Sequence, residues 1–349
     1  EKPVPRGDFS SFEKYRDFLQ STRGRLHENL SAEGRRFPYR WLATISSGYD
    51  GLATAVLARP QGLGEAISIT EGRGGGSDSG ETPSAMLGLS LSLIARDDWR
   101  QTLLPEVPFI AADAKGEDVF LRGAESHLVG RALLTGHYGI AWDKEVKGLS
   151  GGFERKDQAG LSLTEYRLWA GFLHCPIPFF GARQVQDIIT LSHSPEMGPW
   201  DVGGSYNRPI PRRIIETAGI PRGSFATRKR AGSVLFFHRD SFLSPSSLED
   251  FLDWLRDQGD EWRKRGLVPP DHVPGRRTLR QRAAAVAAWG VQLLARATGN
   301  RWGLLAAVGR RLALVANREP LFRYVFPWAM ARAKERYAGI DRQPSRSKF

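Results

Sequence analysis

One short segment, residues 46–51 (Ser-Ser-Gly-Tyr-Asp-Gly), constrains the fold more than any other part of the chain. The apolar residues 41–45 before it are typical of a buried strand, and residues 52–58 after it carry apolar side chains at helical spacing. A small glycine-containing turn between a strand and a helix leaves backbone N–H groups without partners at the positive end of the helix dipole. Such a turn can hold a phosphate group. It has neither the Gly-Lys-Ser/Thr of a Walker A loop nor a G-x-G-x-x-G dinucleotide fingerprint.

Predicted strands and helices alternate beyond this turn. Strands are predicted at residues 41–45, 66–70, 109–112 and 132–135, and helices at residues 83–95 and 117–128. This alternation indicates an α/β protein with a parallel, Rossmann-like sheet between two helical layers. Ligands of such sheets bind beyond the carboxyl ends of the strands. The loops at Ser46, Thr70 and Gly136 would all lie at that edge, which favours a nucleotide site there.

Three regions are predicted along the chain. Residues 1–38 form an N-terminal helical segment that packs on the core, because Phe12, Tyr15 and Leu19 recur at helical spacing. Residues 39–245 form the α/β domain, and a helix is predicted from residue 161 to the prolines that follow Cys175. Residues 246–349 form a basic helical region, which opens with a predicted capping box at 246–249 and contains a proline-rich hinge at 268–274.

The C-terminal region has three predicted helices, at residues 279–297, 302–316 and 322–337, in which arginines alternate with Trp and Leu. Two interpretations are open. The helices form a subdomain whose apolar faces, with Trp289 and Trp328, pack against the core, which is the usual fate of amphipathic helices. Alternatively, they lie on an anionic lipid surface. We expect the packed arrangement and keep peripheral membrane contact as the alternative.

Composition excludes several classes of protein. The single cysteine, Cys175, excludes an internal disulfide framework and a multi-cysteine metal site, and fits a reducing compartment. Residues 1–5 lack the apolar core of a signal peptide, and no run of eighteen apolar residues occurs, so a cytoplasmic protein is expected. The formal net charge of +12 allows contact with nucleic acid or a membrane surface. No RNA-binding box or zinc-finger spacing accompanies that charge.

The turn at residues 46–51 resembles the S-G-G-x-D-S pyrophosphate loop of the N-type ATP pyrophosphatases, whose fold is of the HUP type. Ser47 stands in place of the second-position glycine, and Gly51 in place of the final Ser or Thr. Residues 133–139 with Asp143 are similar to the second phosphate-side motif in the synthetase domain of asparagine synthetases, where a strand ends in Ser/Thr-Gly and an acidic residue follows.

Further segments resemble the same domain in the same order. Residues 161–168 and 176–180 are similar to the helix and the Pro-Phe segment that wall its substrate cleft. Residues 206–213 resemble its K-x-x-L-R segment, with Arg208 in the position of the lysine and Arg212 in that of the arginine. Residues 220–232 are similar to its final P-x-x-x-x-x-R-x-K-x-G segment. The resemblance covers roughly residues 39–235 and includes no glutaminase domain.

The resemblance implies an ATP-dependent, AMP-forming ligase or amidotransferase that activates a substrate carboxylate or amide as its adenylate and releases pyrophosphate. The implied amine donor is ammonia or an amine, free or from a separate glutaminase. Mg²⁺ would be held by Asp50 and Asp143, and the implied catalytic residues are Asp50, Arg208, Arg212 and Lys229. The implied ATP-binding residues are Ser46, Ser47, Gly48, Tyr49, Asp50, Gly51, Thr70, Gly136 and Arg228.

Two other functions stay open. A nucleotide-binding protein without catalysis is favoured by Ser47, Gly51 and the altered 136–143 motif. A tRNA-modifying ATP pyrophosphatase is favoured only by the net charge, because the cysteines of the sulfur-transfer enzymes are missing. His137 and His174 are candidate acid–base groups with a structural role as the alternative. A buried thiol is expected at Cys175, and Glu71, Asp78 and Glu81 either contact a ligand or face solvent.

Overall fold

The computed structural model describes residues 6–72, 75–146, 162–204, 206–225, 234, 242–258, 264, 278–297, 303–317 and 321–338. The chain divides into two compact units that interleave along the sequence. The α/β unit consists of Glu1–Trp99 and Phe120–Ser233, and the helical unit consists of Arg100–Val119 and Val234–Phe349. We describe each unit separately.

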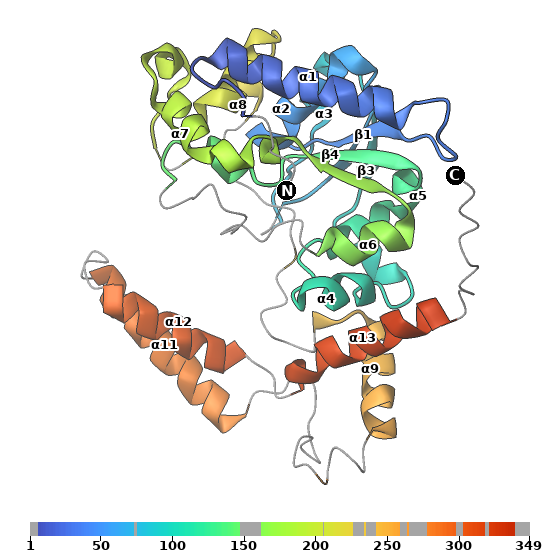
Figure 1. Cartoon of the computed structure of the whole chain (residues 1–349). Coiled ribbons are helices and arrows are strands. Elements are labelled where there is room, and N and C mark those ends of the chain that lie inside the picture. The colour runs from blue at the N-terminus through green and yellow to red at the C-terminus, as the bar shows by residue number, and fades with distance from the viewer. Residues whose placement is uncertain are drawn as a thin grey trace. The chain divides into compact units, whose positions relative to one another are not determined.

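The α/β unit is built on a five-stranded sheet in which all strands are parallel (Figure 1). Its strands are β1 (Arg40–Thr44), β2 (Glu65–Ile69), β3 (Ser90–Ile94), β4 (Arg131–Thr135) and β5 (Leu173–Pro176). Their order is β3-β2-β1-β4-β5, with Ala43 opposite both Ala66 of β2 and Leu134 of β4. The predicted α/β class with a parallel, Rossmann-like sheet is therefore confirmed.

Helices cover both faces of this sheet, because the central strands are apolar on both sides. One face is covered by α1 (Phe12–Leu30), α2 (Tyr49–Ala58) and α8 (Pro209–Thr217), which share a buried cluster with Trp41 and Leu134. The other face, with Leu42 and Leu133, is covered by α5 (Glu125–Leu128) and α6 (Leu163–Ala170) (Figure 1). Helix α7 (Val185–His193) precedes α8 in the chain.

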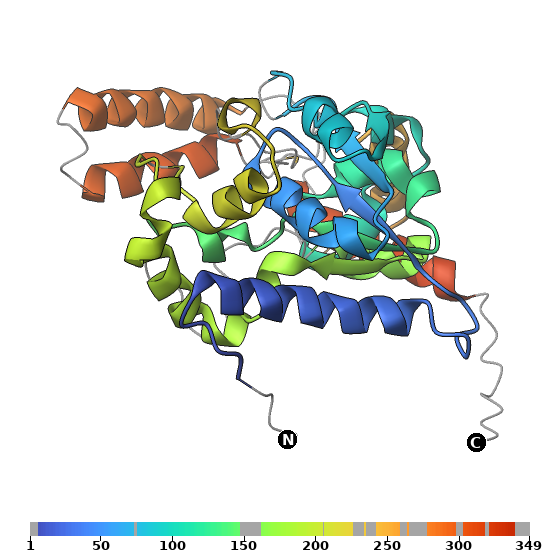
Figure 2. The same cartoon turned by 90° about the horizontal axis from the view of Figure 1, so that it is seen from above.

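The N-terminal helix α1 is part of this core, as its sequence pattern predicts. Phe12, Tyr15 and Leu19 are buried in the same apolar cluster as the sheet, and α1 lies along the sheet in both views (Figures 1 and 2). Ser11 caps the helix by accepting a hydrogen bond from the Lys14 amide. Trp142 Nε1 donates to the Tyr15 hydroxyl at 2.9 Å, so α1 is also anchored to the segment after β4.

The strand order places a topological switch point between β1 and β4. From β1 the chain moves to β2 and then β3 on one side, whereas β4 and β5 lie on the other side of β1. The connection through α2 runs over one face of the sheet, and the connection through α6 runs over the other. In such folds, the carboxyl ends of the two strands at the switch point are where ligands bind.

Four sequence predictions for secondary structure need correction. The helix predicted at 83–95 is only α3 (Glu81–Met86), and the edge strand β3 follows it; the strand predicted at 109–112 is the helix α4 (Val107–Asp113). The helix predicted at 117–128 is a 3-10 helix (Val119–Ala124) followed by α5. The helix predicted from residue 161 to the prolines after Cys175 is much shorter in the structure. Helix α6 ends at Ala170, because Gly171 takes a left-handed conformation, and β5 follows.

The helical unit contains α4, α9 (Pro245–Asp257), α11 (Leu279–Ala297), α12 (Gly303–Asn317) and α13 (Phe322–Ala338). Helix α9 begins two residues earlier than its predicted capping box, since the Ser244 hydroxyl accepts from the Ser247 amide and Pro245 follows as the first helical residue. Helix α13 packs on α4, and its Trp328 is fully buried and donates to Asp250 at 2.7 Å. The predicted hinge at 268–274 lies outside the described residues.

The three predicted C-terminal helices are confirmed as α11, α12 and α13. Trp328 is buried as expected, but within the helical unit, and the expected packing is wrong for Trp289, whose exposed fraction is 66%. In the part of the chain that the structure describes, none of the helices combines the length and apolar character needed to cross a bilayer.

Candidate functional site at the carboxyl edge of the sheet

The loop between β1 and α2 is held by the segment 77–80 that follows β2. The Ser47 hydroxyl donates to the Asp78 carboxylate at 2.6 Å, and the Ser47 amide donates to the Asp78 carbonyl at 3.2 Å. The Asp78 amide in turn donates to the Thr70 carbonyl at 3.0 Å, so Thr70 is connected to the loop through Asp78. Ser46 forms an isolated antiparallel bridge with Ser79. The loops after β1 and β2 are therefore joined to each other at the carboxyl edge of the sheet.

Helix α2 begins without a side-chain cap. Gly48 is its N-cap residue, and the amide of Gly48 donates to the Ser46 hydroxyl at 3.1 Å, so Ser46 satisfies the cap residue rather than the first turn. The first-turn amides belong to Tyr49, Asp50 and Gly51. They lie at the positive end of the α2 dipole, which is the arrangement that binds phosphate in other α/β folds.

Three glycines allow α2 to approach β1 and β4 closely. A Cβ at Gly51 would lie 2.5 Å from the Thr44 carbonyl oxygen, inside van der Waals contact. A Cβ at Gly136 would lie 2.6 Å from the Gly51 amide nitrogen, and one at Gly139 would lie 2.7 Å from Asp50 Oδ1. The loop after β4 therefore encloses the Asp50 side chain, and Gly51 is explained by packing: the hydroxyl that the ATP pyrophosphatases carry here has no room.

Asp50 and Asp143 share one arginine. Arg208, the residue before α8, forms an ion pair with Asp50 through Nη1, and its Nε lies 3.5 Å from Asp143 Oδ2. The Arg208 side chain is only 8% exposed and lies over the Tyr206 ring. Burial lowers the pKa of Arg208, but the charge of Asp50, the hydrogen bond to Asp50 and the charges of Tyr206 and Asp143 together outweigh burial, so that the pKa lies above its usual value. The guanidinium is therefore permanently charged. Asp50 Oδ1 is buried and has no hydrogen-bond partner among the described residues.

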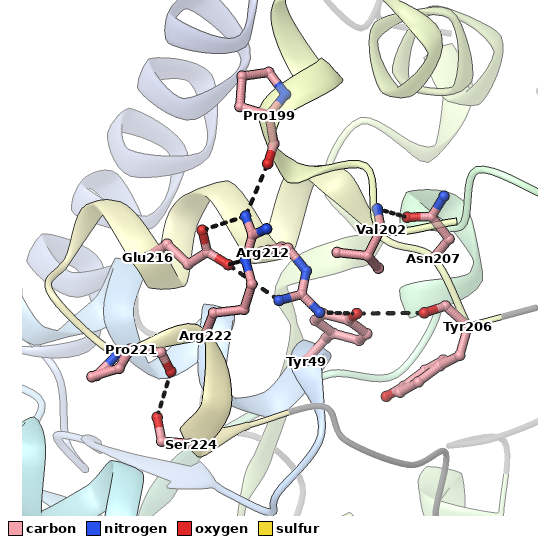
Figure 3. A network of polar contacts seen from close by, with 10 residues as sticks. All are labelled: Tyr49, Pro199, Val202, Tyr206, Asn207, Arg212, Glu216, Pro221, Arg222 and Ser224. Carbon is pink, nitrogen blue, oxygen red and sulfur yellow. Dashed lines mark hydrogen bonds and ion pairs between the residues drawn. The ribbon is translucent and has the colours of Figure 1, made fainter. Parts of the chain in front are cut away.

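A second network fixes Arg212 behind the loop (Figure 3). Arg212 Nη2 donates to the Tyr49 hydroxyl at 2.5 Å, and Nη1 donates to Glu216 at 3.1 Å. The Tyr49 hydroxyl lies 3.4 Å from the Tyr206 carbonyl oxygen, and Arg222 holds Glu216 through both carboxylate oxygens at 2.8 and 2.9 Å. Burial raises the pKa of Glu216, but its hydrogen bonds with Arg222 and Arg212 outweigh burial and lower it. Arg212 thus orients Tyr49 in α2.

Two histidines meet at the ends of β4 and β5. Thr135 Oγ1 lies 2.7 Å from His174 Nε2 and 2.8 Å from His137 Nδ1. Since one hydroxyl has one proton, Thr135 can donate to only one of the two imidazoles and must accept from the other. Cys175 is half-buried, and burial raises the pKa of its thiol to about 11, which opposes a role as a nucleophile. Both observations fit a structural role for these side chains.

The structure brings together many of the residues that the sequence singles out. Asp50, Gly51, Gly136, Asp143 and Arg208 are joined by contacts around Asp50. Ser46, Ser47, Gly48 and Thr70 form the adjoining loop unit. Tyr49 connects the loop to Arg212. Arg228 and Lys229 lie outside the described residues.

Two further residues belong to this arrangement, and the sequence indicated neither role. Tyr206 packs edge-on against Tyr49, with ring centroids 4.7 Å apart, and lies under the Arg208 guanidinium. Glu216 neutralises Arg212. The i,i+4 spacing of Arg212 and Glu216 on one helix is the only sequence signal that could have identified either of them.

No family model matches the sequence, and a search of curated proteins finds no match. The site is therefore interpreted from its own geometry.

Packing around α2 yields a first testable expectation. Gly51→Ser, which restores the residue type of the ATP pyrophosphatase loop, should destabilise the α/β unit by about 1–3 kcal/mol, because the new Cβ overlaps the Thr44 carbonyl oxygen. Urea unfolding followed by circular dichroism measures this change. Gly24→Ser is the control, since nothing lies within 4 Å of a Cβ at Gly24 in α1. Equal stability of Gly51→Ser and the wild type would contradict the close packing.

Proposed function

We propose that this chain is an ATP-dependent ligase or amidotransferase, which activates a substrate carboxylate or amide as its adenylate and releases pyrophosphate. The observation that carries the proposal is the convergence at the switch point between β1 and β4. An uncapped helix N-terminus, a buried arginine and two carboxylates meet where parallel α/β sheets bind their ligands.

The β- and γ-phosphates of ATP would bind at the first turn of α2, where the Tyr49, Asp50 and Gly51 amides supply donors. Thr70 follows the neighbouring strand β2 and is joined to Ser47 through Asp78. Thr70 would therefore lie beside the bound nucleotide. Arg208 would then face negative charge that develops on the α-phosphate, since it is buried and permanently charged. Arg228 and Lys229, which the resemblance places at the same site, would complete this positive environment.

Mg²⁺ fits the donor set at Asp50 and Asp143. Asp50 Oδ1 is a buried oxygen without a hydrogen-bond partner among the described residues, and Asp143 Oδ2 lies 3.5 Å from Arg208 Nε. Among the described residues no group of three or more potential metal ligands occurs, so this part of the chain offers at most the carboxylate pair here. Mg²⁺ ordinarily takes one or two carboxylates and completes its shell with water and phosphate oxygens, and there it neutralises phosphate charge.

The chemistry follows from these groups. An oxygen of the substrate carboxylate attacks the α-phosphorus, a new P–O bond forms, and the bond to the bridging oxygen of the β-phosphate breaks, so that pyrophosphate leaves. Ammonia or an amine then attacks the activated carbonyl carbon and AMP leaves. The residues of this chain act by position and charge: α2 holds the phosphates, and Arg208 stabilises the charge at the reacting phosphorus.

A second candidate function is nucleotide binding without catalysis. One observation favours it: Arg208 already pairs with both carboxylates, so that a divalent cation must compete with a buried guanidinium for Asp50 and Asp143. The two candidates differ in whether pyrophosphate is released when ATP and Mg²⁺ are present.

The test measures ATP binding by calorimetry and released pyrophosphate and orthophosphate in the same samples. The wild type should bind ATP with Mg²⁺ and release pyrophosphate in the presence of a suitable carboxylate. Asp50→Asn should reduce pyrophosphate release by about 100-fold or more, a loss of the size seen when one electrostatic group is removed from an active site. Asp17→Asn is the matched control, because Asp17 is an exposed carboxylate on α1.

The outcomes separate the hypotheses. ATP binding without pyrophosphate release from any carboxylate tested would favour the non-catalytic candidate. Absence of ATP binding by the wild type, or identical behaviour of Asp50→Asn and Asp17→Asn, would contradict a nucleotide site at this edge of the sheet.

A further inference from the structure

The helices α11 and α12 form a hairpin with an unusual charge pattern. They pack on each other along their length and run side by side in both views (Figures 1 and 2). Neither helix contains an Asp or Glu, whereas together they carry five arginines, Arg280, Arg282, Arg296, Arg310 and Arg311. The acidic residues that offset positive charge in this chain all lie outside these two helices.

One face of α11 is buried. Gln281, Ala284 and Ala288 are buried, at the i, i+3 and i+7 spacing of a single helical face. Gly309 of α12 approaches α11, since a Cβ there would lie 3.4 Å from the Val291 side chain.

The opposite face of α11 is apolar and exposed. It carries Leu279, Val286, Trp289 and Leu293, with exposed fractions of 83%, 70%, 66% and 43%, and we call these four residues the α11 outer face. Their spacing of seven, three and four residues keeps them on one side of the helix. Exposed apolar side chains that follow one helical face mark an interaction surface, unlike apolar residues scattered singly.

Exposed arginines lie on both helices of the hairpin. The side chains of Arg280 and Arg282 are exposed next to Leu279, and that of Arg311 is exposed on α12. A tryptophan with leucine and valine on one side of helices that carry arginines but no Asp or Glu is the pattern of a helix that lies in the plane of an anionic membrane surface. The indole of Trp289 suits the boundary between headgroups and acyl chains, because it combines an apolar ring with one N–H donor.

We propose that the α11 outer face docks on the surface of a membrane that contains anionic lipids. Leu279, Val286, Trp289 and Leu293 enter the boundary between headgroups and acyl chains, and Arg280, Arg282 and Arg311 contact the lipid phosphates. This docking does not depend on the proposed enzymatic activity.

Two other occupants fit the charges less well. A second copy of the chain, related by a two-fold axis, would bring the same arginines together without an acidic residue on either hairpin to offset them. A nucleic acid would explain the arginines but not the three exposed aliphatic side chains, since single strands bind on stacked aromatic rings.

The experiment is sedimentation of the full chain with vesicles of phosphatidylcholine alone and of phosphatidylcholine with phosphatidylserine. The chain should bind the anionic vesicles and not the neutral ones. Raising the salt concentration from about 0.1 M to about 1 M shortens the Debye length from about 10 Å to about 3 Å, and should weaken binding strongly. Arg280→Ala/Arg282→Ala should weaken it about 30-fold, since each basic residue near an anionic surface contributes about a five-fold factor.

Matched variants test the apolar part of the surface and the position of the charges. Trp289→Ser should weaken vesicle binding about ten-fold or more, whereas Trp289→Phe should retain most of it. Leu168→Ser is the apolar control, because Leu168 is 68% exposed on α6 of the α/β unit. Arg25→Ala/Arg36→Ala lowers the net charge equally on exposed residues elsewhere and should have little effect.

Three results would overturn the proposal. The first is equal binding to neutral and anionic vesicles. The second is equal loss of binding in Arg25→Ala/Arg36→Ala and Arg280→Ala/Arg282→Ala, which would indicate attraction by net charge alone. The third is absence of vesicle binding together with dimers in analytical ultracentrifugation that Trp289→Ser dissociates, or with RNA binding that it abolishes; either would assign the face to another occupant.

Discussion

Replacement of Arg208 by methionine should destabilise the α/β unit by about 3 kcal/mol. Methionine keeps much of the side-chain volume but leaves Asp50 and Asp143 facing each other without a counter-charge. Removing one partner of a buried ion pair usually costs about 3–5 kcal/mol, and the lower end applies because the Asp50 side chain keeps 22% exposure. Urea unfolding, monitored by circular dichroism, gives the change in the free energy of unfolding.

A double-mutant cycle distinguishes this cause from lost packing. Arg208→Met should be less destabilising in an Asp50→Asn background, because one of the two uncompensated carboxylates is then neutral. Arg25→Met, on the exposed side of α1, should change stability by less than about 0.5 kcal/mol. Equal losses for Arg208→Met in both backgrounds would show that the ion pair is not what stabilises this part of the fold.

The second large effect is expected in the helical unit, at Glu106. This carboxylate is fully buried and accepts hydrogen bonds from the Ser244 amide at 2.5 Å, from the Ser244 hydroxyl at 3.1 Å and from the Ser247 hydroxyl. Glu106→Ala removes the acceptor and leaves these buried donors at the start of α9 unsatisfied. A loss of about 3 kcal/mol is expected from urea unfolding. Glu249→Ala is the control, since Glu249 is exposed on the same helix.

The same residue predicts a pH dependence. Burial raises the pKa of Glu106, although the serine donors partly oppose it. A carboxyl group whose folded-state pKa is raised contributes full stability below its unfolded pKa, about 4.3, and loses that contribution as the pH rises through the folded pKa. Glu106→Gln, which cannot ionise, should therefore gain stability relative to the wild type as the pH rises above about 4.3. A difference in unfolding free energy that stays constant with pH would contradict this assignment.

The central strands could be predicted because each of their sequences indicates a buried strand. Residues 41–45, 66–70 and 132–135 are short, apolar and bounded by turns, and they form β1, β2 and β4 within one residue of the predicted limits. The edge strands were missed for physical reasons. In β3 the sequence Ser-Leu-Ser-Leu-Ile alternates between polar and apolar residues as a strand does. It follows the short helix α3 so closely that the change from helical to strand periodicity was not recognised. In β5 the residues His, Cys and Pro have no strong strand preference.

The helix α4 shows the opposite error. The run Phe-Ile-Ala-Ala is too short for its period to distinguish a strand from a buried helix, and its role depends on partners in α13 that follow it by some two hundred residues in the sequence. Long-range pairs set the same limit for the site. The proximity of Asp50 to Asp143 was expected from the family resemblance, but the ion pair between Asp50 and Arg208 joins residues 158 positions apart and could not be predicted from spacing. The network of Tyr49, Arg212 and Glu216 likewise depends on α8 packing against α2.

The interleaving of the two units has a consequence for how the chain folds during synthesis. Helix α4 leaves the ribosome before the second part of the α/β unit, Phe120–Ser233, yet its partner α13 ends only at Ala338. At ordinary elongation rates the delay is about 10–45 s, during which the α/β unit can complete its sheet. Val107, Phe109 and Ile110, which are buried in the finished protein, must stay in contact with water or a chaperone throughout that interval. A chain that stops at Ser233 never supplies the missing partners, so such a fragment should aggregate through α4 even though every strand of the sheet is present.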